Sequence, residues 1–331
     1  MIEHESEQRQ SILEQPPDEF LNVCAICGSC RYHLIHNRGA IYNDPKHTLR
    51  LDTHICHRCG VIFSNPRLSE KEVREFYRHE QGVLHNNQDI NYLANQSPKA
   101  LTKVRIHYFS QWLTDSPQRI LEIGGGVLNF GVSLAHQYPN IHLDELDPSL
   151  PHNHHLLSNL RLISGFMDKE FPDSISDRYN IIVAFHVLEH QHNPKEFLTI
   201  IKKALTADGL FFLEVPYPFS PFWIRKPIDA CFRTVHPFNF TIRSLKYLLQ
   251  DSGFTVLSYD ISSLAMLRVA AQATKGNANF VPISKHDLRR IDRFFRSWKL
   301  YSGMNKIKPL SRFAHMYAEW VWHRNQNINQ Q

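Results

Sequence analysis

Residues 118–131 read QRILEIGGGVLNFG, and this stretch decides the fold. The short apolar run at residues 120–123 has the character of a buried parallel strand. Three glycines follow at residues 124–126, and apolar residues then recur at helical spacing as far as Ala135. Glycine permits tight turns and close ligand approach, and a helix N-terminus offers free N–H groups. The stretch therefore predicts a strand, a glycine turn and a helix that together form the mouth of a nucleotide-type site.

A carboxylate ends the next apolar segment, residues 141–147. Asp147 lies about 20 residues after Gly126, the distance at which an acidic residue at the tip of the second strand can accept two ribose hydroxyls. The alternative is that Asp147 only caps the turn that begins at Pro148.

The glycine pattern does not complete the dinucleotide fingerprint G-x-G-x-x-G. The motif is instead acid-x-Gly-x-Gly, formed by Glu122, Gly124 and Gly126. On this motif the sequence resembles the class I S-adenosylmethionine-dependent methyltransferases. The resemblance implies that these three residues and Asp147 bind S-adenosyl-L-methionine. It also implies an α/β fold with a Rossmann-like, seven-stranded, doubly wound sheet. Leu128 replaces the third glycine of the family motif, which predicts a side chain near the methionine end of the cofactor and weaker binding.

The chain downstream alternates between strand and helix patterns, which predicts a parallel α/β sheet. Apolar strands at residues 179–185 and 210–216 flank a helical pattern. HVLEHQHNP at residues 186–194 and the His-x-x-x-Phe-Thr signature at residues 236–241 resemble the same methyltransferases. In that family the last two strands, expected here within residues 254–271, pair antiparallel at one edge of the sheet.

A third strand is expected at residues 160–164, followed by Gly165-Phe166-Met167-Asp168. Residues after this strand contact the adenine in the family, so Met167 and Asp168 are candidate cofactor residues, together with Phe166. A turn that merely closes the strand is the alternative.

Cysteines crowd near the N-terminus. Two Cys-x-x-Cys knuckles, Cys24/Cys27 and Cys56/Cys59, would set four thiolates on two tight turns, which suits tetrahedral zinc. Without an export signal, such crowding favours a metal over disulfides. We therefore predict a structural Zn²⁺, the alternative being a domain that keeps the cysteines but binds no metal. Cys30 could replace Cys24 in the first knuckle, although a glycine follows the second cysteine of both preferred knuckles.

Residues 56–77, CHRCGVIFSNPRLSEKEVREFY, resemble the zinc-ribbon extension that precedes many bacterial class I methyltransferase domains. Within them, Ser69-x-x-Glu72 is a capping box that predicts a helix. A second helix, at residues 98–113, precedes the first strand; in the family such a helix lies over the cofactor and substrate mouth. The expected segments are a disordered tail (1–20), a zinc ribbon (21–66), a helical linker or lid (67–115), the S-adenosylmethionine-binding domain (116–273) and a basic, aromatic helical extension (274–331).

Two other segments allow more than one interpretation. Histidines at positions 152, 154 and 155 could suggest a metal, but we interpret them as a solvated loop or helix face because no carboxylate or thiol pattern accompanies them. Arginines and aromatics in residues 289–298, with Trp320 and Trp322, could contact RNA or an anionic membrane surface. A helix that packs its aromatics on the core and exposes its arginines is the favoured interpretation.

Composition bounds the class of protein. Hydrophobic residues make up 42% and charged residues 21%, which is typical of a globular protein. No apolar run reaches the roughly 18 residues that a membrane span needs. The polar, acid-rich N-terminus does not resemble a secretory signal, so we expect a cytoplasmic protein. A net charge of +5 argues against a dedicated nucleic-acid binder.

Three histidines are candidate catalytic residues. His186 follows the fourth strand at the carboxyl edge of the sheet and is the first choice for a general base, because histidine titrates near neutral pH. His190 and His236 come next. A capping or structural role is the alternative for each, as it is for Glu189.

The resemblance implies a methyltransferase acting on a small-molecule or glycan acceptor. Similar zinc-ribbon enzymes methylate sugars and secondary metabolites; the sugar C-methyltransferases carry a further C-terminal domain that we do not expect here, which favours O-methylation. No Asn-Pro-Pro-Tyr motif follows the fourth strand, which argues against amino methylation of bases or glutamine, for which the motif is a family mark. The alternatives are an RNA-directed methyltransferase and a non-catalytic binding module whose cofactor site has degenerated at Leu128.

Overall fold

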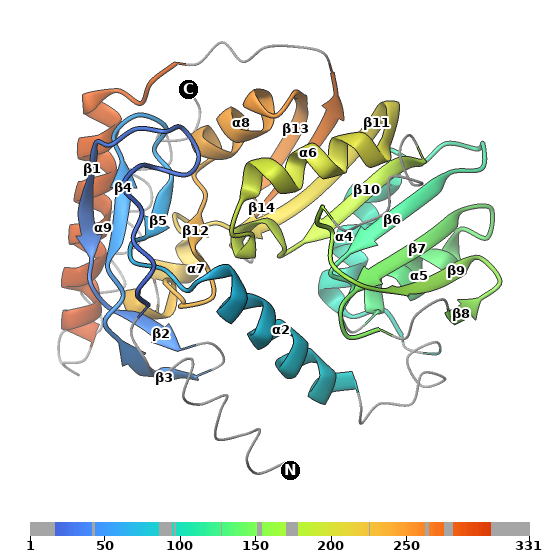
Figure 1. The fold of residues 1–331 in the computed structure, drawn as a ribbon, viewed down its shortest axis with the longest axis horizontal. Coiled ribbons are helices and arrows are strands. Elements are labelled where there is room, and N and C mark those ends of the chain that lie inside the picture. Colours follow the sequence, from blue (N-terminus) through green and yellow to red (C-terminus); the bar gives the residue numbers. More distant parts are fainter. Residues whose placement is uncertain are drawn as a thin grey trace.

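A computed structural model describes residues 17–41, 44–85, 95, 97–126, 128–150, 154–169, 178–224, 226–261, 265–274 and 281–305. A large twisted sheet lies beside a smaller β structure, and a long C-terminal helix runs along the smaller part (Figure 1). No helix in these described ranges is long and apolar enough to cross a membrane.

The large sheet is mainly parallel, as the alternation of strands and helices predicts. Its strands, in spatial order, are β13 (Phe254–Ile261), β14 (Met266–Ala273), β11 (Leu205–Pro216), β10 (Tyr179–Phe185), β6 (Arg119–Ile123), β7 (His142–Asp147), β9 (Leu160–Ser164) and β8 (His154–Leu157). The five strands from β11 to β9 run parallel, whereas β14 is antiparallel to both of its neighbours. This α/β architecture is consistent with the class I methyltransferase fold.

The described sheet has eight strands, so the expected count of seven is wrong. The additional strand is β8, which pairs antiparallel with β9 through His154↔Leu162 and His155↔Arg161. Both histidines are exposed on this edge strand, and His152 lies outside the described residues. An edge strand with no buried face shows no apolar alternation, which is why the segment was interpreted as a loop or helix face.

Helices cover both faces of the large sheet. On one face, α4 (Ala100–Ser110) and α5 (Asn129–Gln137) pack on side chains such as Val183, which shares a core cluster with Phe130. On the other, α6 (Pro194–Ala204) and α8 (Ile242–Asp251) pack on Ile182, which shares a cluster with Phe197. Neighbouring residues of β10 thus serve opposite faces, as a strand with a period of two requires.

The start of α6 brings its first turn to the carboxyl edge of the sheet. The side chain of Asn193 accepts a hydrogen bond from the Glu196 N–H, and Pro194 occupies the first helical position. Both are favoured signals for a helix N-terminus.

A smaller antiparallel sheet carries the cysteine knuckles. Its strands, in spatial order, are β1 (Tyr32–His36), β4 (Thr53–Cys56), β5 (Ile62–Ser64) and β12 (Phe238–Asn239). The fourth strand comes from far along the chain, between β11 and α8, and pairs Phe238 with Phe63. Beside it, β2 (Gly39–Ile41) and β3 (Asp44–Leu49) form a hairpin. The connection from β11 to β12 also contains the short helices α7 (Pro221–Ile224) and η3 (Ile228–Ala230).

The long C-terminal helix is α9 (Lys285–Asn305). It buries Phe294, Phe295 and Trp298 in the core cluster that also contains the knuckle cysteines. Arg289 and Arg293 are exposed. Over the described part of the extension, the aromatics therefore pack inside and the arginines face outward, while Trp320 and Trp322 lie outside the described residues.

Candidate active site

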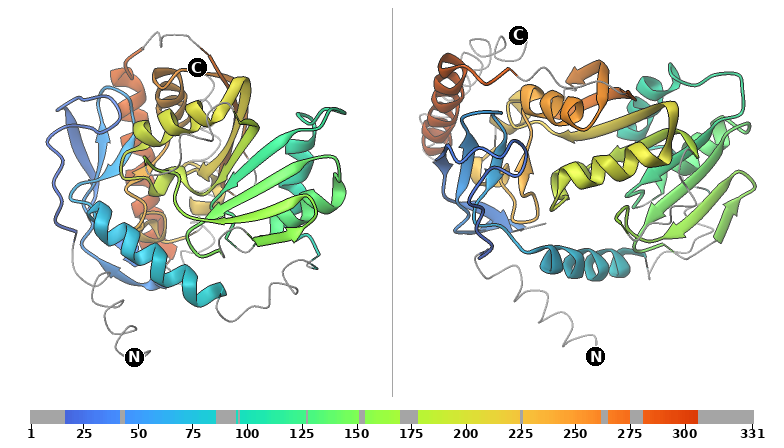
Figure 2. Two further views of the ribbon diagram at one scale, coloured as in Figure 1. Left: turned by 45° about the vertical axis from the view of Figure 1, so that its right-hand side comes forward. Right: turned by 45° about the horizontal axis from the view of Figure 1, so that its top comes forward.

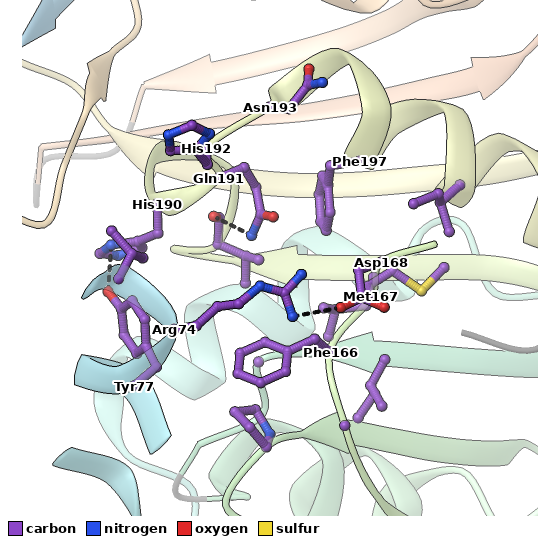
Figure 3. A pocket seen from close by; sticks show the side chains of 18 of the residues that line it. Arg74, Tyr77, Phe166, Met167, Asp168, His190, Gln191, His192, Asn193 and Phe197 are labelled. Atoms are coloured by element: carbon purple, nitrogen blue, oxygen red, sulfur yellow. Dashed lines mark hydrogen bonds and ion pairs between the residues drawn. The ribbon is translucent and has the colours of Figure 1, made fainter. Parts of the chain in front are cut away.

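A cavity opens where the carboxyl ends of four neighbouring parallel strands meet. Residues that follow β6, β7, β9 and β10 line it, together with the first turn of α6. The helix α2 (Glu70–His85), which leads away from the small sheet (Figure 2), supplies the opposite wall (Figure 3). The empty volume, counted with space open to solvent, is about 1160 Å³.

Asp147 and Gly124 lie at the strand ends that the sequence predicts. Both line the cavity. Asp147 Oδ2 accepts the N–H of Gly126 at 3.2 Å, and its Oδ1 accepts the N–H of Ser149 at 2.9 Å. Asp147 thus caps the turn and also lines the cavity, where its binding of ribose hydroxyls stays a prediction. Gly126 itself is not among the lining residues and instead helps to hold the carboxylate.

Gly124 forms a narrow part of the wall. Its backbone has φ 72°, and a Cβ placed there would lie 2.7 Å from Val187 Cγ2. A side chain at this position would strain the backbone and enter the wall of the cavity. This cradle and the carboxylate of Asp147 fit the sugar and backbone contacts that S-adenosyl-L-methionine requires.

Glu122 does not line the cavity. It is buried at 3% exposure, next to the wholly buried Glu145. Burial raises the pKa of Glu122 to about 7, and burial together with the Glu122 charge raises the pKa of Glu145 well above its usual range. Glu145 also lies under the glycine turn, because a Cβ built on Gly125 would meet its Oε2 at 1.9 Å. Glu122 therefore lies with Glu145 in the buried layer beneath the glycine turn.

Leu128 lies away from the cavity wall. It is wholly buried in the core cluster beneath α5, with φ 58°. Its side chain is not among the cavity residues, which argues against the obstruction expected from the missing third glycine. The motive for proposing a degenerate cofactor site is correspondingly weaker.

The loop after β9 brings the predicted residues to the cavity, where they meet one that the sequence did not reveal. Phe166, Met167 and Asp168 all line the cavity after β9. Arg74 of α2 pairs with Asp168 at 2.8 Å, and its guanidinium carbon lies 5.2 Å from the Phe166 ring centre (Figure 3). Only the three-dimensional fold brings α2 to this loop, so no local signal could have identified Arg74.

The helix that covers the cavity is not the expected one. Residues 98–113 were expected over the mouth, but no residue of α4 lines the cavity. Instead, α4 buries Ile106 and Phe109 in the core on one face of the sheet. The covering helix is α2, from the opposite end of the predicted linker.

His186 lines the cavity between two carboxylates. Its Nδ1 lies 3.1 Å from Glu189 Oε1 and its Nε2 lies 3.3 Å from Glu214 Oε1. Although burial opposes it, hydrogen bonding to these glutamates raises the pKa of His186 to about 9. At neutral pH His186 is therefore an imidazolium with no lone pair, which makes it a poor general base.

Glu214 completes this charged group. It is wholly buried and pairs with Arg105 and, at 2.7 Å, with Arg268. Burial raises its pKa, but the hydrogen bond from His186 and the charge of Arg105 outweigh that effect and hold the pKa at about 2. An ionised Glu214 thus keeps His186 protonated.

His190 is the neutral histidine of the cavity wall. Its Nδ1 lies 2.8 Å from the carbonyl oxygen of Val235 and also contacts the Tyr77 hydroxyl (Figure 3). A carbonyl oxygen can only accept, so Nδ1 carries the hydrogen and Nε2 keeps a lone pair. Burial lowers the pKa of His190, which keeps it neutral.

His236 lies behind His190 and does not line the cavity. The two ring centres are 4.5 Å apart. Burial, followed by the charge of Arg233, lowers the pKa of His236 well below its usual value. The structure thus brings the three predicted histidines together, but only His186 and His190 reach the cavity.

The four knuckle cysteines form a compact, buried cluster. Cys24 Sγ lies 3.7 Å from Cys59 Sγ, and Cys27 Sγ lies 3.4 Å from Cys56 Sγ. All four sulfurs lie within 4.8 Å of one another. Tetrahedral zinc with Zn–S bonds of about 2.3 Å separates its ligands by about 3.8 Å, so the donor set fits this metal. Cys30 is exposed and lies outside the cluster.

Comparison with known proteins agrees with this arrangement. A family model described as "Methyltransferase domain" matches residues 93–259. A comparison with curated proteins found no significant match.

Several solved structures are similar to this chain. One is the 1,6-didemethyltoxoflavin-N1-methyltransferase of Burkholderia thailandensis, with 1,6-didemethyltoxoflavin and S-adenosylhomocysteine bound; it is 15% identical over 72% of this chain and 100% of that chain, with a TM-score of 0.44. Another is a putative S-adenosylmethionine-dependent methyltransferase from Listeria monocytogenes, 14% identical over 54% of this chain and 100% of that chain, with a TM-score of 0.41.

Proposed function

Because this chain belongs to the methyltransferase-domain family and is an S-adenosylmethionine-dependent methyltransferase, we propose that it methylates an oxygen of a small acceptor. The acceptor class is a sugar, a glycan precursor or a secondary metabolite. The observation that carries the proposal is a single cavity lined by the Asp147 carboxylate and by two histidines of different charge, His186 and His190.

In the cofactor half of the site, each residue has its own role. Asp147 accepts the ribose hydroxyls, Gly124 lets the backbone approach, and Met167 and Asp168 lie against the adenine. Gly126 orients Asp147 through its N–H at 3.2 Å, and Glu122 supports the turn from beneath. When bound, the cofactor supplies an activated methyl group, so the protein needs only to align the acceptor and exclude water.

The acceptor half is formed by the histidines. His186 is cationic and holds a positive charge beside the acceptor, its two ring nitrogens facing Glu189 and Glu214. The Nε2 lone pair of His190 can hold a hydroxyl proton or a cation. A neutral imidazole next to a charged one suits an acceptor that must lose a proton. His236 packs against His190 and limits its movement, a positioning role.

The location of the cavity favours a small acceptor over RNA. The exposed arginines 289, 293 and 296 lie on α9, which runs along the small sheet at the opposite end of the molecule from β8 and β9 (Figure 1). A strand of RNA bound to α9 would have to cross the small sheet to reach the cavity. The four cysteines, Cys24, Cys27, Cys56 and Cys59, would hold a structural Zn²⁺ that stabilises this sheet.

Calorimetric titration with S-adenosyl-L-methionine tests the cofactor site. We expect the zinc-loaded chain to bind, and Asp147→Asn to weaken binding by about tenfold or more, because a charge-assisted hydrogen bond contributes about 1.5–3 kcal/mol. Asp115→Asn, at an exposed loop position, is the matched control and should bind like the wild type. Absence of binding heat from folded wild-type protein would refute the proposal.

A further inference from the structure

Glu189, His190 and His236 converge beside the cavity. Each offers one ligand atom, and these atoms lie within 4.8 Å of one another. His190 Nε2 lies 3.8 Å from Glu189 Oε1. All three residues come from the segments that follow β10 and β11, and Glu189 and His190 share the short helix η2 (Leu188–His190).

From these contacts we propose that Glu189, His190 and His236 form a second metal site, which binds a divalent first-row transition ion such as Zn²⁺. This site is separate from the cysteine cluster. Two imidazoles and one carboxylate are three protein ligands, the number typical of a site that keeps a coordination position open.

The hydrogen bonding of His190 is that of a metal ligand. Its Nδ1–H donates to the Val235 carbonyl at 2.8 Å, which fixes the tautomer and leaves the Nε2 lone pair facing Glu189. Metal-ligating histidines almost always donate their second ring N–H to a carbonyl or a carboxylate in this way.

Two further atoms at the site have no partner. His236 Nδ1 and Glu189 Oε2 are buried, and within the described ranges neither makes a hydrogen bond. Glu189 and His236 are 1% and 7% exposed. Buried polar atoms are rarely left without a hydrogen-bond partner. A cation bound by the three residues would account for both atoms.

The ligand set also selects the metal. Magnesium and calcium prefer oxygen ligands, whereas imidazoles suit zinc and its first-row neighbours. Glu189 Oε1 is already 3.1 Å from His186 Nδ1, so its Oε2 is the oxygen left for the metal. The positive charge of His186 opposes a nearby cation, but Glu214 lies 3.3 Å from the other nitrogen of His186 and offsets it.

The open position gives the ion a role in the reaction. His190 is the ligand that lines the cavity, so the ion would lie at its edge. A hydroxyl bound to such an ion ionises more easily and releases its proton to solvent. This role rests on the proposed function, whereas binding of the metal does not.

Metal content tests the site directly. Wild-type protein and His236→Gln are treated with EDTA, loaded with Zn²⁺, desalted and analysed by mass spectrometry for zinc per chain. We expect His236→Gln to hold one equivalent fewer than the wild type. Equal zinc content in the two proteins would overturn the proposal.

Control variants and a second titration make the result specific. His155→Ala removes an exposed histidine and should retain the wild-type zinc content. If His236→Gln does not fold, Glu189→Gln takes its place with the same expected loss. Titration of the wild type with S-adenosyl-L-methionine is run in parallel. If His236→Gln holds one zinc fewer but the wild type binds no cofactor, the proposed function is refuted and the metal site is not.

Discussion

His186 owes its position to an unusual backbone angle. It directly follows β10 with φ 58°, a left-handed conformation that residues other than glycine seldom adopt. That angle points the ring between Glu189 and Glu214 instead of along the strand. Strained residues of this kind cluster at functional sites, where the surrounding structure holds them in place.

The charge of His186 makes stability depend on pH. Its pKa is about 9 in the folded chain and about 6.5 when unfolded, so folding is favoured by protonation. The contribution is complete below about pH 6.5 and is lost as the pH rises through 9. We expect the free energy of unfolding, measured in urea, to fall over this window in the wild type and to fall less in His186→Gln.

Two outcomes decide this prediction. Parallel pH profiles for the wild type and His186→Gln would contradict it. His155→Ala, which removes an exposed histidine from β8, should follow the wild-type profile.

Leu128 offers a test of local backbone conformation. Truncating this wholly buried side chain removes core packing and costs about 2–5 kcal/mol, whereas relief of a left-handed φ returns only about 1–2 kcal/mol. Both Leu128→Ala and Leu128→Gly should therefore be destabilised, with the glycine variant the more stable by about 1 kcal/mol. Urea unfolding of both variants measures this order, which is the reverse of the usual preference for alanine near a helix.

Cofactor binding supplies the second observation on Leu128. Since its side chain lies in the core beneath α5, neither variant should gain affinity for S-adenosyl-L-methionine. A large gain in Leu128→Gly would mean that the leucine does obstruct the ligand.

At the scale of elements, the cavity depends on how α2 is attached. Arg74 bonds to Asp168 in the loop after β9, and Tyr77 contacts His190 after β10. One helix therefore bridges both halves of the cavity, the half assigned to cofactor and the half assigned to acceptor (Figure 3).

Loss of Arg74 should weaken cofactor binding without unfolding the chain. The ion pair is partly exposed, with side chains 28% and 18% accessible, so we expect about 1 kcal/mol, or roughly fivefold in affinity. Calorimetry of Arg74→Ala measures it. Lys71→Ala changes an exposed residue of the same helix, 84% accessible, and should leave affinity unchanged; equal loss in both variants would contradict the bridging role.

The sequence predicts elements whose signal is local. The run that ends at Ile123, the glycine turn and Asp147 at the next strand end could all be assigned, because each is a short pattern with a physical meaning. The elements that the sequence does not reveal depend on long-range contacts. β8 has no apolar alternation, and β12 contributes only two residues to its sheet. α2 contacts Asp168, which lies far along the chain. Glu122 was placed in the cofactor site on its motif alone, yet its burial beside Glu145 depends on the neighbouring strand.

At the scale of the whole molecule, the cysteine cluster and the large sheet share one core. The buried cluster that holds Cys24 and Cys56 continues through Phe238 to Leu213 of β11. Disrupting one part of a continuous core destabilises the rest, because packed interiors transmit strain.

Disrupting the cysteine cluster should therefore destabilise the entire chain. Cys24→Ser removes one of four thiolates, and we expect loss of zinc and a lower melting temperature, in a single thermal transition followed by circular dichroism. Cys30→Ser alters an exposed cysteine outside the cluster and should keep both zinc and melting temperature. Separate transitions for the two sheets would show that they fold independently.

The pairing of Phe238 with Phe63 has a consequence for how the protein is made. A ribosome delivers the first three strands of the small sheet early, but β12 emerges only after most of the large sheet has been translated. Until then the β5 edge stays open, ready to pair with any other extended chain. Shortened genes that stop before β12 should accordingly yield aggregates, even though they encode every cysteine of the cluster.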